Sequence, residues 1–331
     1  MTKRVRTTIH DVARAAGVSH QTVSNVLNGR GRVGEATRAR VDAAVQALDY
    51  RPHAGAASLR TKRSGRLAYP MSANDFGPLN TIMLEFIHAL SAAAGACEHH
   101  LVLATGPDDI ERLVRSGAVD AVVLANLAER DPRVSALAAR GIPFACFGRT
   151  AADLPQCWVD VDNRAGTRAA TGHVLAVGHR DVAFLGYTPQ GGWDEQREAG
   201  YRDAMTAALL PARLCRADLD PADARRAVDE LLGGPTAPTA VVAGSDVLAS
   251  ELYAGAARHG RTIGVDLAVT GFDGSVTGRL LTPSLTTVAI PMTAIAERLV
   301  ARVLAELDGR GGAPGELLAP ELAVGDSSGR S

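Results

Sequence analysis

Apolar residues between positions 8 and 50 recur at helical spacing in three short stretches. The apolar positions are Ile9, Val12, Ala13 and Ala16 in the first stretch, Val23, Val26 and Leu27 in the second, and Val41, Ala44, Val45 and Leu48 in the third. Thr8 and Ser19 stand where their hydroxyls cap a helix, and Asp11 stands where the acid of a capping box belongs. Gly17 separates the first two stretches, where a left-handed backbone ends a helix most easily. The pattern predicts three helices, the third over residues 34–49.

From Arg66 onward, short apolar runs alternate with amphipathic stretches. The runs predict strands at residues 67–69, 101–103, 121–124, 144–147, 158–161, 182–185, 240–243 and 267–270, with a weak one near 214. Helical spacing predicts helices at residues 79–94, 164–177, 195–209, 221–232 and 247–259, and shorter ones from 108 and from 131. The two series predict an α/β body of two lobes, each a parallel sheet flanked by helices. Because ligands bind at the carboxyl ends of such strands, we expect a pocket between the lobes.

The second N-terminal helix has a polar outer face. That face carries His20, Gln21, Ser24, Asn25 and Asn28. Two helices joined by a short turn with glycine, the second with a polar face, are typical of the helix-turn-helix motif, which places its second helix in the major groove of DNA. The pattern by itself fits an ordinary helical hairpin equally well.

Charge favours the DNA-binding alternative. Residues 1–63 hold 12 Lys and Arg against four Asp and Glu, a net charge of +8. The whole chain has 35 Lys and Arg and 36 Asp and Glu. Residues 64–331 therefore hold 23 basic and 32 acidic residues, a net charge of −9. A basic head on an acidic body is the distribution expected of a protein that neutralises backbone phosphates and releases their counterions.

The chain resembles the lac repressor (LacI/GalR) family of bacterial transcription regulators. The segment IHDVARAAGVSHQTVSNVLNG, followed by VGEATRARVDAAVQALDYRPHAGAASLRT, is similar to the family's N-terminal part. Motifs of the body also match: VDVDN at 159–163, REAGY at 197–201, TAVVAGSD at 239–246, GFDG at 271–274 and LTPSLTTV at 281–288. The resemblance implies an all-α helix-turn-helix head and a two-lobed, periplasmic-binding-protein-like body.

The resemblance also implies the division of the chain. We expect a DNA-binding domain at residues 1–52, a hinge helix and linker at 53–63, and an effector-binding and dimerisation domain at 64–331. Within the last, we expect the first lobe to comprise about 64–161 plus 290–310, and the second lobe about 162–289 plus 311–331.

The head offers side chains for two kinds of DNA contact. We expect His20, Gln21 and Asn25 to read base edges, with Gln21 best suited to an adenine edge. Hydroxyl, amide and guanidinium groups are expected to hold phosphates. The residues expected to contact phosphates are Thr8, Ser19, Ser24, Asn28 and Arg38. We also expect Thr22 to contact DNA. Arg38 matches a phosphate-contacting position of the family.

The predicted hinge is rich in alanine and too short to hold a helix alone in water. The resemblance implies that it folds on operator DNA, where two copies pack in the minor groove and a leucine wedges a base step open. Leu59 matches that leucine, and Ala56 matches the small residue at the groove floor. The alternative for Leu59 is a linker residue that packs on the body.

The resemblance also places effector contacts in the body. Arg197 and Asp273 match residues that bind polar groups of a small molecule, and a guanidinium with a carboxylate suits the hydroxyls of a sugar. The alternative is a structural ion pair between them. Asn126 and Ser245 match further polar positions. Trp193 either stacks on a sugar face or packs a loop.

Several classes of protein are disfavoured. The only lysines, Lys3 and Lys62, leave no P-loop lysine in the body, and neither a GxSxG nor an HExxH motif is present. The motif GDSSG at 325–329 lies in a tail that we expect to be frayed. No run of about 18 apolar residues predicts a membrane span. A free-standing solute-binding protein would share the two lobes. We disfavour this class because such a protein would carry an export signal and would lack the basic N-terminal segment seen here.

We therefore expect a ligand-controlled repressor, not an enzyme, with no metal and no cofactor. Its expected partners are pseudo-palindromic double-stranded operator DNA, a second copy of the chain, and an effector that is a sugar or related polyol, with nucleobases and other small metabolites as the alternatives. The four cysteines have no CxxC spacing, so we expect reduced thiols and a cytoplasmic location, at the nucleoid when DNA is bound.

Overall fold

The computed structural model describes residues 7–27, 31–50, 63–71, 82–106, 109–189 and 192–329. The chain forms two compact units, Met1–Ser64 and Gly65–Ser331, and we describe each by itself. Three residues expected to contact DNA, Asn28, Ala56 and Leu59, lie outside the described residues, as does most of the predicted hinge.

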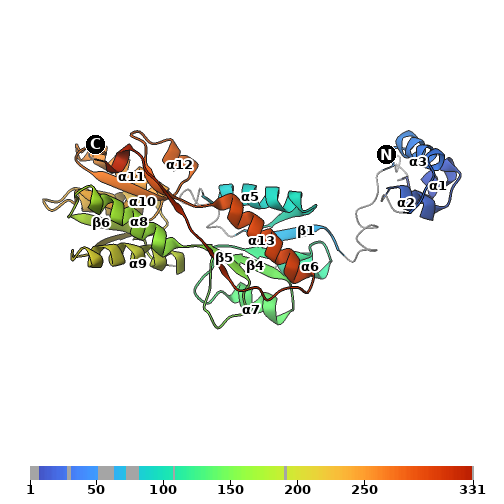
Figure 1. The fold of residues 1–331 in the computed structure, drawn as a ribbon, viewed down its shortest axis with the longest axis horizontal. Coiled ribbons are helices and arrows are strands. Elements are labelled where there is room, and N and C mark those ends of the chain that lie inside the picture. Colours follow the sequence, from blue (N-terminus) through green and yellow to red (C-terminus); the bar gives the residue numbers. More distant parts are fainter. Residues whose placement is uncertain are drawn as a thin grey trace. The chain divides into compact units, whose positions relative to one another are not determined.

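The first unit is the predicted three-helix bundle, with α1 (Ile9–Ala16), α2 (His20–Leu27) and α3 (Glu35–Ala47) (Figure 1). Val12, Val23 and Val41, one from each helix, are completely buried together. Their burial explains the apolar spacing of the sequence, because each helix hides one stripe against the other two. The described part of this unit therefore has one small apolar core.

The predicted helix ends are present. The carboxylate of Asp11 accepts hydrogen bonds from the backbone N–H of Thr8 at 3.0 Å and from its hydroxyl at 2.7 Å. Gly17 takes the left-handed conformation, with a φ of 61°, and so ends α1. The hydroxyl of Ser19 accepts from the backbone N–H of Thr22 at 3.1 Å and caps α2. These contacts fix the turn between the two helices.

The second unit contains two six-stranded sheets. The strands are β1 (Arg66–Pro70), β2 (His100–Ala104), β3 (Ala121–Leu124), β4 (Phe144–Phe147), β5 (Trp158–Val161), β6 (Val182–Tyr187), β7 (Arg213–Ala217), β8 (Ala240–Ala243), β9 (Ala268–Asp273), β10 (Thr286–Ala289), β11 (Glu316–Leu318) and β12 (Glu321–Ala323). The helices are α5 (Ile82–Ala96), α6 (Asp109–Arg115), α7 (Pro132–Ala139), α8 (Asn163–Ala176), α9 (Gly192–Ala207), α10 (Pro221–Leu232), α11 (Asp246–Arg258), α12 (Val276–Arg279) and α13 (Met292–Leu307). All nine predicted strands are present.

The sheet orders are β11-β5-β4-β3-β1-β2 and β12-β10-β9-β8-β6-β7. The described strand pairs are parallel except β10 with β12, which is antiparallel. Helices α5 and α13 pack side by side on the first sheet (Figure 1). Helices α8 and α9 cover one face of the second sheet, and α10 and α11 cover the other. The predicted α/β class with two mostly parallel sheets is confirmed.

The last part of the chain differs from the expected lobe division. We assigned residues 311–331 to the second lobe, but β11 pairs with β5 in the first sheet, where Leu318 lies opposite Val161. In residues 311–329, β12 and the segment after it lie with the second sheet. Pro320 stands between the two strands and lacks the N–H needed to continue a ladder, so the chain leaves one sheet for the other at that point.

The predicted frayed tail at residues 325–329 is wrong. Ser327 and Ser328 are completely buried. The Ser327 hydroxyl donates to the carbonyl of Val269 at 2.6 Å, and the Ser328 hydroxyl lies 2.8 Å from Nε2 of His173. These hydrogen bonds hold the tail against the second sheet, because buried hydroxyls need partners.

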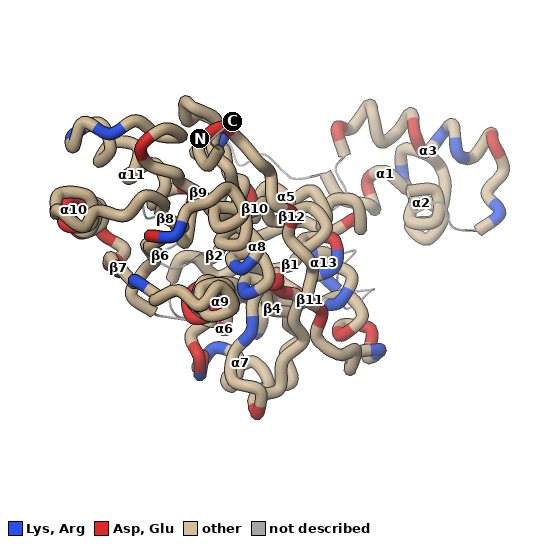
Figure 2. The backbone as a smooth tube through the Cα atoms, turned by 60° about the vertical axis from the view of Figure 1, so that its left-hand side comes forward, with Lys and Arg blue, Asp and Glu red and all other residues tan. Residues whose placement is uncertain are grey.

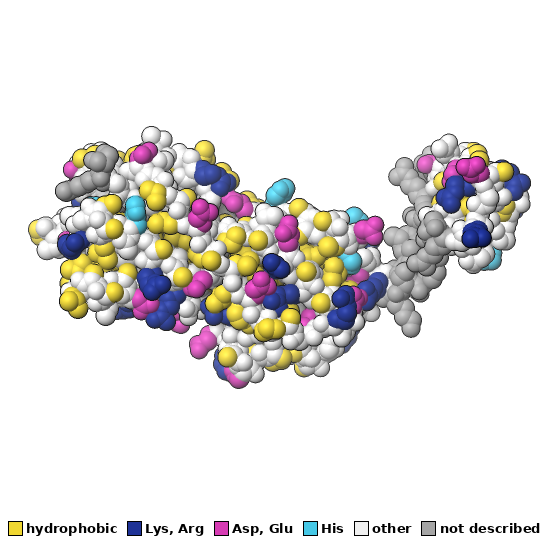
Figure 3. All heavy atoms as spheres, in the orientation of Figure 1, with side chains coloured by type: hydrophobic (Ala, Val, Ile, Leu, Met, Phe, Trp, Pro, Cys, Tyr) yellow, Lys and Arg dark blue, Asp and Glu magenta, His cyan; other side chains and the backbone are white. Residues whose placement is uncertain are grey.

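The surface of the body mixes charge signs. Acidic and basic positions are interspersed along the backbone (Figure 2), and the visible face shows charged side chains among apolar ones (Figure 3). In the described part of the chain, no helix is both long enough and apolar enough to cross a membrane. The described residues also contain no group of three His, Cys, Asp or Glu that could hold a metal ion.

Candidate DNA-binding surface and effector pocket

Helix α2 presents the side chains that we expect to read DNA. His20 and Gln21 are exposed, and Thr22, Ser24 and Asn25 are half-buried, while Val23 and Val26 face the core. The side-chain amide of Gln21 donates to the amide oxygen of Asn25 at 3.2 Å. Gln21 and Asn25, two of the three predicted base-reading residues, therefore lie one helical turn apart on one outer face.

The residues expected to hold phosphates flank this face. Thr8 and Ser19 are exposed at the starts of α1 and α2, and Arg38 is exposed in the first turn of α3. His10, which the sequence analysis did not select, lies with its ring centroid 5.3 Å from that of His20. The first turn of α1 thus lies beside the first turn of α2.

The body contains a cavity of about 750 Å³. It is lined by residues that follow β3, β4 and β5 of the first sheet and β6, β8 and β9 of the second, together with the first turns of α9. All five residues that we selected as effector contacts are among the lining residues: Asn126, Trp193, Arg197, Ser245 and Asp273. The structure therefore brings together side chains from four separate segments.

Arg197 is held from several sides. Its Nη1 lies 3.2 Å from Oδ1 of Asp273 and donates to the carbonyl of Gly244 at 2.6 Å. Its Nε donates to the amide oxygen of Asn163 at 2.9 Å. The guanidinium also lies over the ring of Phe272, 3.7 Å from the centroid. The ion pair that the sequence analysis gave as the alternative is present, and both residues line the cavity, while contact with an effector stays a prediction.

Asp273 has an unusual environment. It is the last residue of β9, with a φ of 114°, and its side chain is buried. The pKa of its carboxyl is raised to about 7, chiefly by burial; the positive charge of Arg197 opposes that rise, and the nearby carboxylate of Asp246 adds to it. A carboxyl with this pKa changes its charge near neutral pH.

Ser245 and Trp193 lie on the second-lobe side of the cavity. The Ser245 hydroxyl caps α11 by accepting from the N–H of Leu248 at 3.1 Å, and lies 3.1 Å from the hydroxyl of Tyr187. The ring of Tyr187 meets that of Trp193 edge to face, with centroids 6.1 Å apart. Trp193 also lies over Arg197, whose guanidinium carbon is 4.8 Å from the ring centroid.

The sequence analysis missed residues on the first-lobe side of the cavity. Nε of Arg149 lies 2.9 Å from Oδ2 of Asp160, and the guanidinium lies 5.2 Å from the ring centroid of Trp158. Burial raises the pKa of Asp160, and Arg149 opposes that rise. The signal was present in the sequence, because Asp160 is a charged residue inside the apolar strand WVDV.

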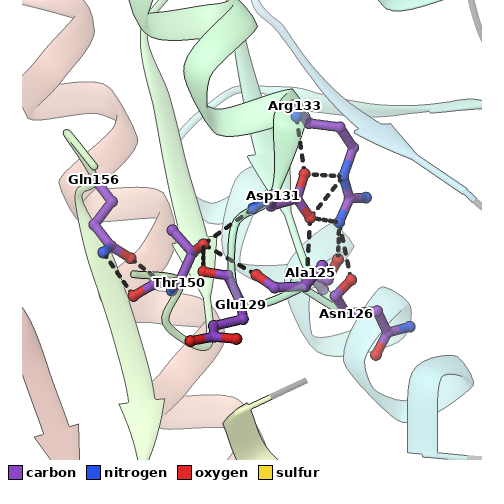
Figure 4. Close-up of polar contacts among 8 residues, drawn as sticks. Ala125, Asn126, Glu129, Asp131, Arg133, Thr150 and Gln156 are labelled. Carbon is purple, nitrogen blue, oxygen red and sulfur yellow. Dashed lines mark hydrogen bonds and ion pairs between the residues drawn. The ribbon is translucent and has the colours of Figure 1, made fainter. Parts of the chain in front are cut away.

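A polar network holds the two loops at the first-lobe rim (Figure 4). Nη2 of Arg133 pairs with Asp131 at 2.7 Å and donates to the carbonyls of Ala125 and Asn126 at 3.0 and 2.9 Å. The network keeps Asn126 in a left-handed conformation, with a φ of 50°. The loop after β3 is therefore fixed by the start of α7.

Thr150 joins that loop to the loop after β4. Its buried hydroxyl lies 3.0 Å from the carbonyl of Ala128 and 2.6 Å from that of Glu129, and it accepts from the N–H of Asp131 at 3.1 Å. The side-chain amide of Gln156 bonds the backbone of Thr150 from the other side (Figure 4). Hydrogen bonds thus hold both first-lobe loops in one position.

The chain matches two known families. Residues 8–53 match the family described as bacterial regulatory proteins, lacI family, and residues 171–328 match a periplasmic binding protein-like domain. The regulator RafR of Escherichia coli is 30% identical over 80% of this chain and 80% of its own length. The chain belongs to the LacI family. It is therefore a DNA-binding transcriptional regulator, and its named relatives are regulators, not enzymes.

Solved structures of this LacI-family fold match almost the whole chain. A lac repressor dimer bound to operator and the anti-inducer ONPF superposes with a TM-score of 0.86 and covers 98% of this chain and 99% of its own, at 23% identity. A complex of the regulator CelR with cellobiose has a TM-score of 0.72 and 28% identity, and covers 97% and 100%. The fold predicted from the resemblance is thereby confirmed.

Proposed function

We propose that this LacI-family regulator is a homodimeric repressor of a pseudo-palindromic operator, released or recruited by a carbohydrate bound in the body. The observation that carries the effector class is the cavity of about 750 Å³, in which Arg197 and Asp273 are paired beside Trp193. Charged hydrogen-bonding groups next to an indole face suit the hydroxyls and the apolar face of a sugar ring. The cellobiose bound to the related CelR supports this class.

The proposed DNA contacts follow the geometry of the head. Gln21, Asn25 and His20 lie on the outer face of α2 and reach base edges, while Thr8, Ser19, Thr22, Ser24 and Arg38 hold phosphates beside them. Two copies of the head read two half-sites, since a dimer imposes its twofold symmetry on the operator. Asn28, Ala56 and Leu59 complete the proposed interface by the family resemblance.

Selection of randomised duplex DNA by the purified full-length protein tests both parts. We expect the selection to recover a palindromic sequence, and we expect the protein's affinity for it to change on addition of one sugar from a panel. Repeating the selection at two salt concentrations separates sequence-specific binding from binding to phosphates alone. Sequence-blind, strongly salt-dependent binding contradicts the operator proposal. A palindrome that responds to nucleobases but to no sugar contradicts the effector class alone.

A further inference from the structure

The two lobes present the same three chemical groups to the cavity. On the first-lobe side, Trp158 lies under Arg149, which is paired with the buried Asp160. On the second-lobe side, Trp193 lies beside Arg197, which is paired with Asp273. We call these sets the first cluster (Trp158, Arg149, Asp160) and the second cluster (Trp193, Arg197, Asp273). All six residues line the one cavity.

Both clusters are rigidly built. The side chains of Arg197 and Asp273 are each 8% exposed, and that of Asp160 is likewise 8% exposed. Trp158 packs so closely on Gly315 that a Cβ at that position would overlap the indole. Side chains held in this way do not need to be ordered when a ligand arrives, which reduces the entropy lost on binding.

Among the described lining residues, the cavity offers an anionic ligand no cation that lacks a carboxylate partner. Its charged lining residues, within the described chain, are Glu129, Arg149, Asp160, Asp194, Arg197 and Asp273. Each of the two arginines is already paired with a carboxylate, at 2.9 Å in the first cluster and 3.2 Å in the second. A phosphate or carboxylate entering the cavity would meet surplus negative charge, and close like charges are strongly unfavourable in a partly dry site.

We propose that the effector is an uncharged glycan of at least two rings, with one ring against each cluster. This inference rests on the proposed carbohydrate effector and narrows it. Each indole lines the cavity beside its arginine and gives one ring an apolar boundary, and each paired aspartate accepts hydrogen bonds from hydroxyls of that ring. A ligand with a single ring contacts one cluster and leaves the other in contact with water. A sugar phosphate is repelled by the surplus negative charge of the cavity.

Calorimetric titration of the purified full-length protein at pH 8 tests the inference, because Asp273 is ionised above its pKa of about 7. The probes are maltose, cellobiose, melibiose, sucrose and trehalose as uncharged disaccharides, glucose and galactose as single rings, and glucose 6-phosphate and glucuronate as anions. We expect at least one disaccharide to bind at least about tenfold more tightly than every single-ring and anionic probe, a difference that corresponds to one lost subsite.

The outcomes separate the two proposals. If glucose or glucose 6-phosphate binds as tightly as the best disaccharide, the two-ring, uncharged effector is wrong while a carbohydrate effector stands. If none of the probes binds, while the operator response is shown with another class of molecule, both proposals are wrong.

Asp160→Asn tests the charge argument directly. The substitution removes the partner of Arg149, so we expect glucose 6-phosphate to bind at least about tenfold more tightly than to the wild type, since an unpaired guanidinium is a good phosphate ligand. The double variant Arg149→Gln/Asp160→Asn should lose that gain. Asp153→Asn is the matched control, because Asp153 pairs with Arg130 at 2.6 Å on the exposed surface, with both side chains 63% exposed. Unchanged phosphate affinity in Asp160→Asn contradicts the inference.

Discussion

Arg197 and Asp273 lie 3.2 Å apart, nitrogen to oxygen, with each side chain only 8% exposed, although 75 residues of chain separate Arg197 in α9 from Asp273 at the end of β9. The pair joins α9, whose first turns line the cavity, to the last residue of β9, a central strand of the second sheet. Because both groups are buried, their mutual attraction is needed to offset the loss of their hydration. The pair therefore contributes both to the fold of the second sheet and to the proposed effector site.

Removal of Arg197 should weaken the body strongly. Arg197→Ala leaves Asp273 buried without its partner, and breaking a buried pair in this way costs about 3–5 kcal/mol of unfolding free energy. Denaturant unfolding at pH 8 measures this. Arg164→Ala is the control, because its pair with Asp203 is exposed at 55% and 37%, so the loss of that pair should lower the unfolding free energy far less. Equal losses in the two variants would refute the importance of burial here.

The pH dependence of stability should reveal Asp273. Its pKa in the folded protein, about 7, lies above the ordinary value of 3.8, so the folded state holds the proton more tightly than the unfolded state. The contribution is fully present below pH 3.8 and is lost as the pH rises through 7. Between pH 5 and 8 we expect the wild type to lose on the order of 2 kcal/mol relative to Asp273→Asn. Parallel pH profiles of the two proteins would contradict this assignment.

Two substitutions in the head should affect DNA binding differently. Gln21→Ala should relax operator preference at one base position by about 1–3 kcal/mol, because a base contact is lost. Arg38→Ala should weaken all DNA about equally and reduce the salt slope by about one. Binding to the selected operator and to single-base variants of it, at several salt concentrations, measures both.

Arg40→Ala is the control for Arg38→Ala, since both residues are exposed on α3 but two positions apart, which places them on different sides of the helix. We expect Arg40→Ala to change the salt slope less. A base profile that does not respond to Gln21→Ala would remove Gln21 from the interface.

The rim network should depend on one hydroxyl. Thr150→Val keeps the shape of the side chain but leaves the N–H of Asp131 and two carbonyls without the hydroxyl, so we expect a loss of about 1–3 kcal/mol in unfolding free energy and weaker effector binding. Thr150→Ser should restore both, because it keeps the hydroxyl. Effector affinity that is equal in Thr150→Val and wild type would show that the loop positions do not depend on this network.

Much of the fold followed from local patterns. Central strands such as Ala121–Leu124 and Ala240–Ala243 are short buried apolar runs, and a fully buried strand has this composition. Strand β10 was missed because two of its four residues, Thr286 and Thr287, are polar. Strands β11 and β12 have three residues each, too few to show a period. Helix α13 was missed although its buried residues do recur at helical spacing.

The second-lobe side of the candidate site could be predicted from the sequence, and the first cluster on the first-lobe side could not. The second-lobe residues Arg197 and Asp273 stand in motifs that resemble those of a known family. The pairing of Arg149 with Asp160 could not be predicted in the same way, because it depends on the neighbouring positions of β4 and β5 in the first sheet. Local spacing determines which face of an element is buried, whereas pairing across a sheet depends on the whole topology.

The break at Pro320 has a mechanical consequence. Within the described chain, the two sheets are joined by three covalent connections: from β5 to α8, from β10 to α13, and from β11 to β12. A single tether would let two bodies tumble independently, but three adjacent tethers permit little besides rotation about their common line. The three connections thus favour one relative movement of the two sheets, a rotation about that line. A molecule that binds in the cavity, which residues of both sheets line, therefore acts mainly on this one rotation.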